Sequence, residues 1–152
     1  HDGTEDEAIA ALLHDSLEDQ AVHLGGAEQL RKRIRRRFGE RVVEIVDGCT
    51  DAVTHPKPEW EGRKQRYIEA IETATESVCL VIAADKLHNA RSILDDLYEI
   101  GNEVWEKFKP TRERSLWYYR SVTEALKPRL PQRGKHLVQE LDRVVTQLEE
   151  WK

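Results

Sequence analysis

Residues 76–97 read ESVCLVIAADKLHNARSILDDL, and this pattern sets the fold class. The part VCLVIAA is apolar at every position, and a helix that is apolar all round lies in the core of a protein. The same segment continues into ADKLHNAR at 84–91, where Asp85 and Asn89 lie one helical turn apart with His88 between them. The sequence therefore predicts a central helix that delivers polar side chains into the core.

The other stretches also carry apolar residues at helical spacing. Leu30, Ile34 and Phe38, for example, form a stripe along one helix face. No stretch has the sustained alternation of polar and apolar residues that a strand requires. We therefore predict an all-α bundle of about six to eight helices, forming one domain over residues 1–152. The further helices are expected over residues 5–17, 30–38, 40–48 (ended by Gly48), 59–74, 111–126 and 129–152 (amphipathic), with loops at 49–58 and around Gly101.

Composition excludes some classes of function. Charged residues make up 35% of the 152 residues, with a net charge of −5. This balance argues against a general coat for nucleic acid, since phosphate backbones require a basic surplus. No apolar run approaches the length of a membrane span, so we expect no membrane partner. Cys49 and Cys79 lie far apart without a CxxC pair, which favours reduced core thiols and a cytoplasmic location.

A second polar cluster lies in LLHDSLED at residues 12–19, where a histidine and three acids directly follow the apolar run AIAALL. Its histidine and three of its acids are spaced so that, on a helix, they lie near one edge. Burial of unpaired carboxylates is costly, so this cluster requires an arginine or a metal ion to compensate its charge. The alternative is a helix end that is open to solvent, with its acids hydrated.

The two clusters together favour a metal site. An imidazole with carboxylates is a suitable ligand set for Mn, Fe or Zn. A bound ion would neutralise the aspartates of both clusters and lower the pKa of a bound water. For Asp85, an ion pair with Lys86 or Arg91 is the alternative.

These motifs resemble those of a known enzyme family. LLHDSLED followed by ADKLHNAR is similar to the paired motifs of HD-domain metal-dependent phosphohydrolases, and within them of the RelA/SpoT-type (p)ppGpp hydrolases and their small stand-alone members. FGERVVEIVDGCTD at 38–51 and WEGRKQRY at 60–67 fit the same subgroup. WYYRSVTEAL at 117–126 resembles the tail of small single-domain members. The resemblance implies an HD-domain helical bundle that hydrolyses a phosphorylated nucleotide with a divalent metal ion, Mn²⁺ being the expected one.

The resemblance also implies a role for each residue that matches a motif. The metal ligands are His14, Asp15 and Asp85. The catalytic residues that position and activate the attacking water are Glu18 and Asp19. The residues expected to contact the substrate are Asn89, Lys86, Leu87, Ser92, Arg63, Lys64 and Tyr67.

The resemblance implies one further histidine ligand, on a helix that precedes the His-Asp pair and lies upstream of residue 1. The sequence contains no methionine and opens at His1 without a helix cap. We therefore expect the N-terminal helix of the domain, with that histidine, to lie outside this sequence.

Three hypotheses for function follow. The leading one is a cytoplasmic phosphohydrolase that removes the 3′-pyrophosphate of guanosine tetra- or pentaphosphate. The second keeps the reaction but changes the substrate to another nucleotide or a phosphorylated cofactor, because a metal cluster fixes the reaction type better than the substrate. The third is a non-catalytic nucleotide-sensing module, which the presence of both Glu18 and Asp19 speaks against. All three hypotheses are compatible with a homo-oligomer.

Other signals carry less weight. The run RKRIRRR at 31–37 is interpreted as the solvated face of a helix, with phosphate steering or an oligomer contact as alternatives. His23, His55 and His136 lack partner residues at ligand spacing and are expected on the surface. The four tryptophans are expected in the core or in interfaces.

Overall fold

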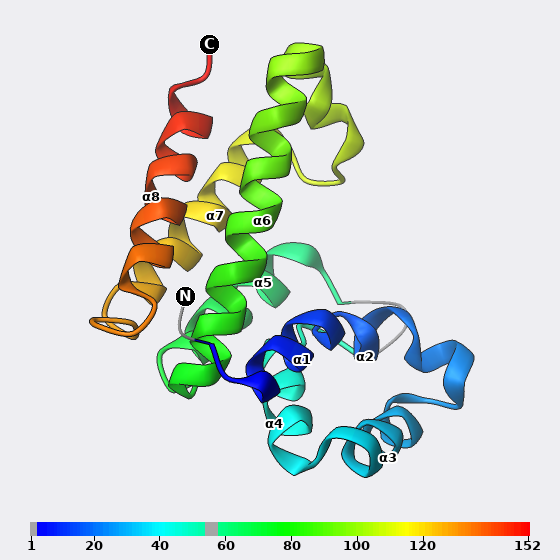
Figure 1. Cartoon of the computed structure of the whole chain (residues 1–152). Coiled ribbons are helices and arrows are strands. Elements are labelled where there is room, and N and C mark those ends of the chain that lie inside the picture. Colours follow the sequence, from blue (N-terminus) through cyan, green and yellow to red (C-terminus); the bar gives the residue numbers. More distant parts are fainter. Residues whose placement is uncertain (1–2, 54–57) are drawn as a thin grey trace.

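The computed structural model describes residues 3–53 and 58–152, and every regular element within these ranges is a helix (Figure 1). The prediction of an all-α fold is therefore confirmed. His1 and His55 lie outside the described residues. The elements are α1 (Glu5–Leu13), α2 (Ser16–Asp19), η1 (Ala21–Leu24), α3 (Ala27–Phe38), α4 (Glu40–Cys49), α5 (Trp60–Ile71), α6 (Glu76–Ile100), η2 (Gly101–Lys107), α7 (Arg112–Leu126) and α8 (Lys135–Glu150).

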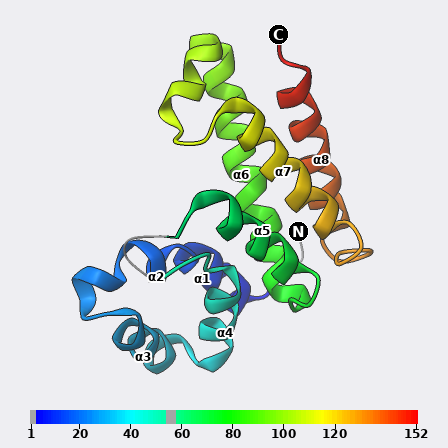
Figure 2. The ribbon, with the colours of Figure 1, turned by 180° about the vertical axis from the view of Figure 1, so that it is seen from behind.

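The helix α6 is the centre of the fold. It begins at the cap residue Thr75, whose hydroxyl accepts a hydrogen bond from the backbone N–H of Val78, and it continues for 25 residues. It contacts α1 and α4 near its beginning and α7, α8 and η2 farther along, as Figures 1 and 2 show from opposite sides. Its residues from Val78 to Ala83 are all buried, as their uninterrupted apolar character predicts.

The helices α7 and α8 cover one side of α6. In α8, buried residues recur at helical spacing: Leu137, Val138, Leu141, Val144, Val145 and Leu148. These residues form one apolar face, through which α8 packs along α6 with α7 beside it (Figure 2). This helix begins at Lys135, later than the predicted start at 129, because Pro128 and Pro131 cannot donate backbone hydrogen bonds and residues 129–134 form turns instead.

The helices α1, α3 and α4 pack together on the other side of α6. In α3, Leu30 and Ile34 are buried, whereas Arg33 and Arg36 are exposed. The arginines thus lie mostly on the outer face of α3, as predicted, and phosphate steering and an oligomer contact stay alternatives for that face. Within the described residues, no helix has the length and apolar character needed to cross a membrane.

The first predicted helix is interrupted. It was expected to run from 5 to 17, but α1 ends at Leu13, and His14 and Asp15 form a turn before α2 begins at Ser16. The imidazole Nδ1 of His14 lies 2.7 Å from the carbonyl oxygen of Ala11, so the ring takes a carbonyl acceptor at the end of α1. This local side-chain bond competes with continuation of the helix.

Two glycines differ from their predicted roles. Gly48 does not end α4 but lies inside it, where an added Cβ would be 2.5 Å from Cγ2 of Val78. Gly48 therefore permits close packing of α4 against α6. Gly101 does not start an irregular loop but begins the short 3-10 helix η2, with a positive φ of 61°. By contrast, Gly39 separates α3 from α4 as predicted, with φ of 93°.

Candidate active site

The turn between α1 and α2 holds His14 against the central helix. With Nδ1 directed at the carbonyl of Ala11, the other ring nitrogen, Nε2, lies 3.0 Å from Oδ2 of Asp15 and 3.1 Å from Oδ1 of Asp85. The two carboxylates, Asp15 foremost, raise the pKa of His14 to about 10. The predicted convergence of the two polar clusters is thus observed, with His14 at the meeting point.

Asp85 comes from α6 and is nearly buried, with 11% of its side chain exposed. Its Oδ1 accepts a hydrogen bond of 2.8 Å from the amide of Asn89, and its Oδ2 lies 2.6 Å from Nζ of Lys86. Burial acts to raise the pKa of Asp85, but His14 and Lys86 hold it well below its usual value. The alternative ion pair with Lys86 therefore exists beside the histidine contact, whereas Arg91 pairs with Glu140.

The side chains of His14, Asp15, Asp85 and Lys86 line one cavity of about 90 Å³. Its walls come from α2 and the turn before it, α4, α5, α6, α7 and the segment after α4. Most of the lining is polar. The lining residues are His14, Asp15, Glu18, Cys49, Asp51, Lys64, Tyr67, Asp85, Lys86 and Tyr118.

Two lysines and two tyrosines form one side of this cavity. The ammonium of Lys64 lies 4.6 Å from the ring centre of Tyr118, and that of Lys86 lies 5.7 Å from it. Tyr67 lies within 6 Å of both ammonium groups, at 5.8 and 5.9 Å. Each ammonium thus lies near an aromatic ring and 2.6 Å from a carboxylate oxygen, that of Asp51 for Lys64 and that of Asp85 for Lys86. Two cations in one cavity are suited to an anionic ligand next to a metal ion.

The other predicted site residues lie outside the cavity lining. Asp19 is exposed at the end of α2, whereas its neighbour Glu18 lines the cavity. Leu87 is 3% exposed and belongs to the core. Ser92 is exposed, and its hydroxyl donates a hydrogen bond of 3.1 Å to the carbonyl of His88. The roles proposed for these residues stay predictions.

Three lining residues were missed by sequence reasoning. Asp51 follows an apolar helix, as the two recognised clusters do, and this pattern could have indicated it. Tyr118 lies in a run of three aromatic residues, 117–119, and the sequence does not indicate which of them faces the core. Cys49 and Cys79 were predicted to be reduced core thiols, and both are free and buried. Burial raises the pKa of the Cys49 thiol to about 12, so the thiol is protonated and a poor nucleophile near neutral pH.

The donor set of this site fits a divalent ion in part. Among the described residues, Nε2 of His14 is a buried atom with no hydrogen-bond partner, although both carboxylates approach it. An imidazole nitrogen flanked by two carboxylate oxygens matches the ligand preference of Mn, Fe or Zn. In the same part of the chain, no group of three or more His, Cys, Asp and Glu side chains has the geometry of a complete metal site. The three side chains therefore form a partial donor set centred on His14.

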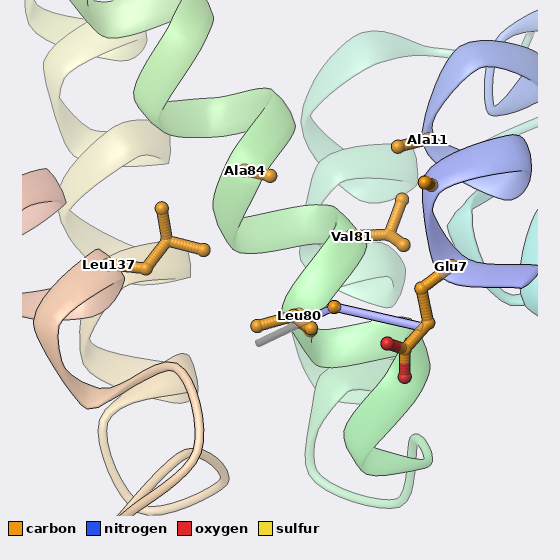
Figure 3. A pocket seen from close by; sticks show the side chains of 8 residues that line it. Glu7, Ala11, Leu80, Val81, Ala84 and Leu137 are labelled. Atoms are coloured by element: carbon orange, nitrogen blue, oxygen red, sulfur yellow. The ribbon is translucent and has the colours of Figure 1, made fainter. Parts of the chain in front are cut away.

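A second pocket, of about 140 Å³, lies between α1, α6 and α8 (Figure 3). Its one titratable group is Glu7, whose carboxylate points toward the first turn of α6 in Figure 3 and pairs with Arg133 and Ser77. The pocket offers no group for chemistry and is not the candidate active site. Its lining residues are Gly3, Glu7, Ala8, Ala11, Leu80, Val81, Ala84 and Leu137.

Comparison with known proteins agrees with this geometry. The family model described as "HD domain" matches residues 1–112. The chain belongs to the HD domain family. The match includes both polar clusters, so the implied HD-domain bundle is confirmed for this chain.

Several relatives of this HD-domain protein have names that state an activity. The chain is 33% identical over 127 residues to the guanosine-3′,5′-bis(diphosphate) 3′-pyrophosphohydrolase MESH1 of Xenopus tropicalis, covering 82% of this chain and 60% of that protein. It is 36% identical over 96 residues to MESH1 of Danio rerio, covering 61% of this chain and 48% of that protein. The enzyme of the same activity from Aquifex aeolicus is 27% identical over 121 residues, covering 76% of this chain and 16% of that protein. The chain thus spans less than two thirds of each relative.

A solved structure has the same fold. The crystal structure of lmo0812 from Listeria monocytogenes EGD-e superposes with a TM-score of 0.81 at 29% identity, covering 97% of this chain and 90% of the other. This likeness includes α7 and α8, which lie beyond the residues matched by the family model.

Proposed function

We propose that this HD-domain protein is a metal-dependent phosphohydrolase of nucleotides, and that it removes the 3′-pyrophosphate of guanosine 3′,5′-bis(diphosphate). The observation that carries the proposal is the buried Nε2 of His14, flanked by two carboxylates in a cavity that also holds two lysines. The names of the relatives supply the choice of substrate. The same proposal places the protein in the cytoplasm, with a role in the stringent response.

In this proposal His14, Asp15 and Asp85 hold a divalent ion, for which we propose Mn²⁺. When bound, such an ion polarises a phosphoryl oxygen and lowers the pKa of a water molecule. The contact from Nδ1 of His14 to the carbonyl of Ala11 fixes the ring so that Nε2 faces the ion site. The amide of Asn89 orients the carboxylate of Asp85 in the same way.

Glu18 is the general base of the proposed reaction. Its Oε1 accepts a hydrogen bond of 2.7 Å from the backbone N–H of Asp51, which orients the carboxylate at the cavity wall. Glu18 accepts a proton from the water as its oxygen attacks the phosphorus next to the 3′ oxygen. The bond from this phosphorus to the 3′ oxygen breaks, pyrophosphate leaves, and the 3′ oxygen takes up a proton. Asp19, which is exposed, has at most an indirect part in this step.

Lys64 and Lys86 face the phosphate groups in this scheme. Both lie on the Tyr118 ring, and their charges stabilise the negative charge that develops during phosphoryl transfer. Because Leu87 and Ser92 do not line the cavity, the described residues leave the base of the nucleotide unspecified. Another nucleotide or a phosphorylated cofactor is therefore the second candidate substrate.

The test is release of pyrophosphate from guanosine 3′,5′-bis(diphosphate) by the purified protein with Mn²⁺. A panel of other nucleotides and phosphorylated cofactors, assayed for phosphate and pyrophosphate, separates the two substrate candidates. We expect turnover of the guanosine compound above all others. Binding of nucleotides by calorimetry without any turnover would favour the non-catalytic sensing module, and gel filtration reports the oligomeric state.

A further inference from the structure

Asp51 joins the catalytic and cationic parts of the site. It lies in the segment directly after α4, with only 6% of its side chain exposed. Its backbone N–H donates the hydrogen bond to Oε1 of Glu18. Its side-chain Oδ2 pairs with Nη1 of Arg63 and lies 2.6 Å from Nζ of Lys64. A single residue thus contacts a proposed base and two cations.

Resting on the proposed function, we propose that Asp51 is a positioning residue whose backbone orients Glu18 and whose carboxylate holds Arg63 and Lys64 where a substrate phosphate binds. Arg63 and Lys64 are neighbours on α5, and their side chains are mostly buried, with 12% and 16% exposed. Asp51 lines the 90 Å³ cavity and also a neighbouring cavity of about 330 Å³, which Arg63 lines as well. The carboxylate therefore stands in the wall between two cavities.

The cations need this carboxylate to stay in place. Lys64 and Lys86 both lie on the ring of Tyr118, and Arg63 is adjacent to Lys64, so three positive charges gather in a partly buried region. Lys86 has Asp85 as its counter-charge, and Lys64 has Asp51. Burial lowers the pKa of Lys64, and Asp51 opposes that effect. Without Asp51, repulsion among the cations would move Lys64 away from the cavity.

The geometry of the Asp51 pair differs from that of a structural clamp in the same protein. Glu7 binds Arg133 through both carboxylate oxygens, which is the two-point geometry of a strong Arg–carboxylate pair. Asp51 places both of its cations on Oδ2. Among residues 3–53 and 58–152, its buried Oδ1 and the buried Nε of Arg63 have no hydrogen-bond partner. The Nε–H of Arg63 is therefore a donor available to a phosphate oxygen, whereas Oδ1 of Asp51 can only accept.

The first experiment compares Asp51→Asn with the wild-type protein in the hydrolysis assay. The variant keeps the backbone N–H, and therefore the contact with Glu18, but loses the charge that holds Lys64. We expect KM to rise about tenfold, the typical effect of losing a charged hydrogen bond, with kcat unchanged. Asp51→Glu retains the charge and is expected to recover part of the loss. An unchanged KM in Asp51→Asn, or a lower kcat as its main effect, would overturn the proposal.

A matched control separates positioning from general stability. Asp142 of α8 also pairs with two cations, Arg120 of α7 and Lys127 directly after α7. It lies outside the 90 Å³ cavity. Asp142→Asn is expected to leave KM and kcat at wild-type values. In a Lys64→Met background, Asp51→Asn is expected to raise KM little further, because the group it positions is absent. If the fold-increase of KM in the double variant equals the product of the two single increases, Asp51 does not act through Lys64.

Binding of inorganic pyrophosphate with Mn²⁺, measured by calorimetry, tests Asp51 without turnover. We expect an affinity loss of about tenfold in Asp51→Asn. If the wild-type protein hydrolyses no nucleotide but binds pyrophosphate about tenfold more tightly than Asp51→Asn does, the proposed function fails and the role of Asp51 stands. If hydrolysis occurs but pyrophosphate affinity and KM are insensitive to Asp51, the role of Asp51 fails alone. If Asp51→Asn does not fold, the decision rests on Lys64→Met, which removes the cation that Asp51 is proposed to hold and for which an unchanged KM overturns the proposal.

Discussion

At the scale of single residues, the carboxylate of Asp85 has contacts that fit two roles, an ion-pair partner and a metal ligand. Its Oδ2 meets Lys86, as in a simple buried ion pair, while its Oδ1 faces the imidazole of His14. An ion pair alone would not require the second contact, nor a histidine nitrogen buried beside it without a hydrogen-bond partner among the described residues. The metal hypothesis accounts for the position of Oδ1, and the pair with Lys86 accounts for Oδ2.

Removal of divalent ions tests this hypothesis. Chelation with EDTA is expected to abolish pyrophosphate release, and Mn²⁺ is expected to restore it in the wild-type protein. In Asp85→Asn, Mn²⁺ affinity measured by calorimetry is expected to fall by at least about tenfold, as for disturbed metal sites in general. Asp96→Asn on the same helix is the control, since Asp96 is 42% exposed and pairs with Lys107. Wild-type Mn²⁺ affinity in Asp85→Asn would mean that Asp85 serves its lysine pair alone.

Glu18 and Asp19 are distinguished by position, although the sequence presents them as equals. Glu18 lines the cavity, whereas Asp19 is exposed and outside its lining. We expect Glu18→Gln to lower kcat by about 10²–10⁴-fold, the typical loss for a positioned general base. We expect Asp19→Asn to have a much smaller effect. Both variants are expected to melt close to the wild-type temperature, and a larger kcat loss in Asp19→Asn would assign the base to Asp19.

At the scale of helices, Glu7 connects three elements. This residue of α1 is 2% exposed, and its carboxylate binds Ser77 in the first turn of α6 at 2.6 Å and Arg133 in the turns before α8. Its Oε2 also accepts a hydrogen bond of 2.7 Å from the backbone N–H of Thr4, which completes the cap of α1. Burial alone would raise the pKa of Glu7, but these bonds, Arg133 first, lower it from 4.5 to about 2.

The lowered pKa of Glu7 gives stability a predictable dependence on pH. The folded state binds this proton less readily than the unfolded state, so the contribution is complete above pH 4.5 and is lost as the pH falls toward 2. A shift of this size corresponds to about 3 kcal/mol. We expect Glu7→Gln to be less stable in urea at pH 7 and to lose less stability than wild type between pH 5 and about pH 2.5, within the window set by the two pKa values. Parallel stability curves for the two proteins would show that Glu7 does not carry this effect.

The contact of α4 with α6 is set by Gly48. Since an added Cβ would lie 2.5 Å from Val78, we expect Gly48→Ala to lower the free energy of unfolding by about 1–3 kcal/mol, the usual cost of overpacking a core. Val78→Ala removes the opposing methyl groups, so the double variant is expected to lose less than the sum of the two single losses. Urea titrations of the four proteins measure this coupling, and strict additivity would rule out the clash.

Helix positions were largely predictable from the sequence, whereas helix ends and site neighbours were not. The stripe of Leu30 and Ile34 and the apolar start of α6 depend on periodicity, which burial confirms. The break at His14 depends on a side-chain bond to the backbone, which periodicity does not register. Tyr118 reaches the cavity through the packing of α7 against α5 and α6, which no spacing along the chain predicts, whereas the position of Asp51 directly after an apolar helix was an available signal.

At the scale of the whole molecule, the site depends on helices from both ends of the chain. The family model ends at residue 112, where α7 begins, yet Tyr118 of α7 lines the cavity next to Asp85 and His14. The position of α7 is in turn fixed by α8, α6 and α5, which all contact it (Figure 2). The helix α7 is therefore part of the site, and α8 supports it by packing against α7 and α6.

The ring of Tyr118 offers the most direct test of this dependence. Because Lys64 and Lys86 both lie on this ring, its loss in Tyr118→Leu is expected to raise KM for the nucleotide by about 3- to 30-fold, the range of partly to fully desolvated cation–π contacts. Tyr118→Phe keeps the ring and is expected to keep the wild-type KM. Trp117, the neighbouring residue, is 39% exposed and outside the cavity lining, so Trp117→Leu controls for loss of an aromatic contact with Trp60. Equal KM values in Tyr118→Leu, Trp117→Leu and wild type would mean that α7 supports the cavity only as packing, and that the lysines are positioned by Asp51 and Asp85 alone.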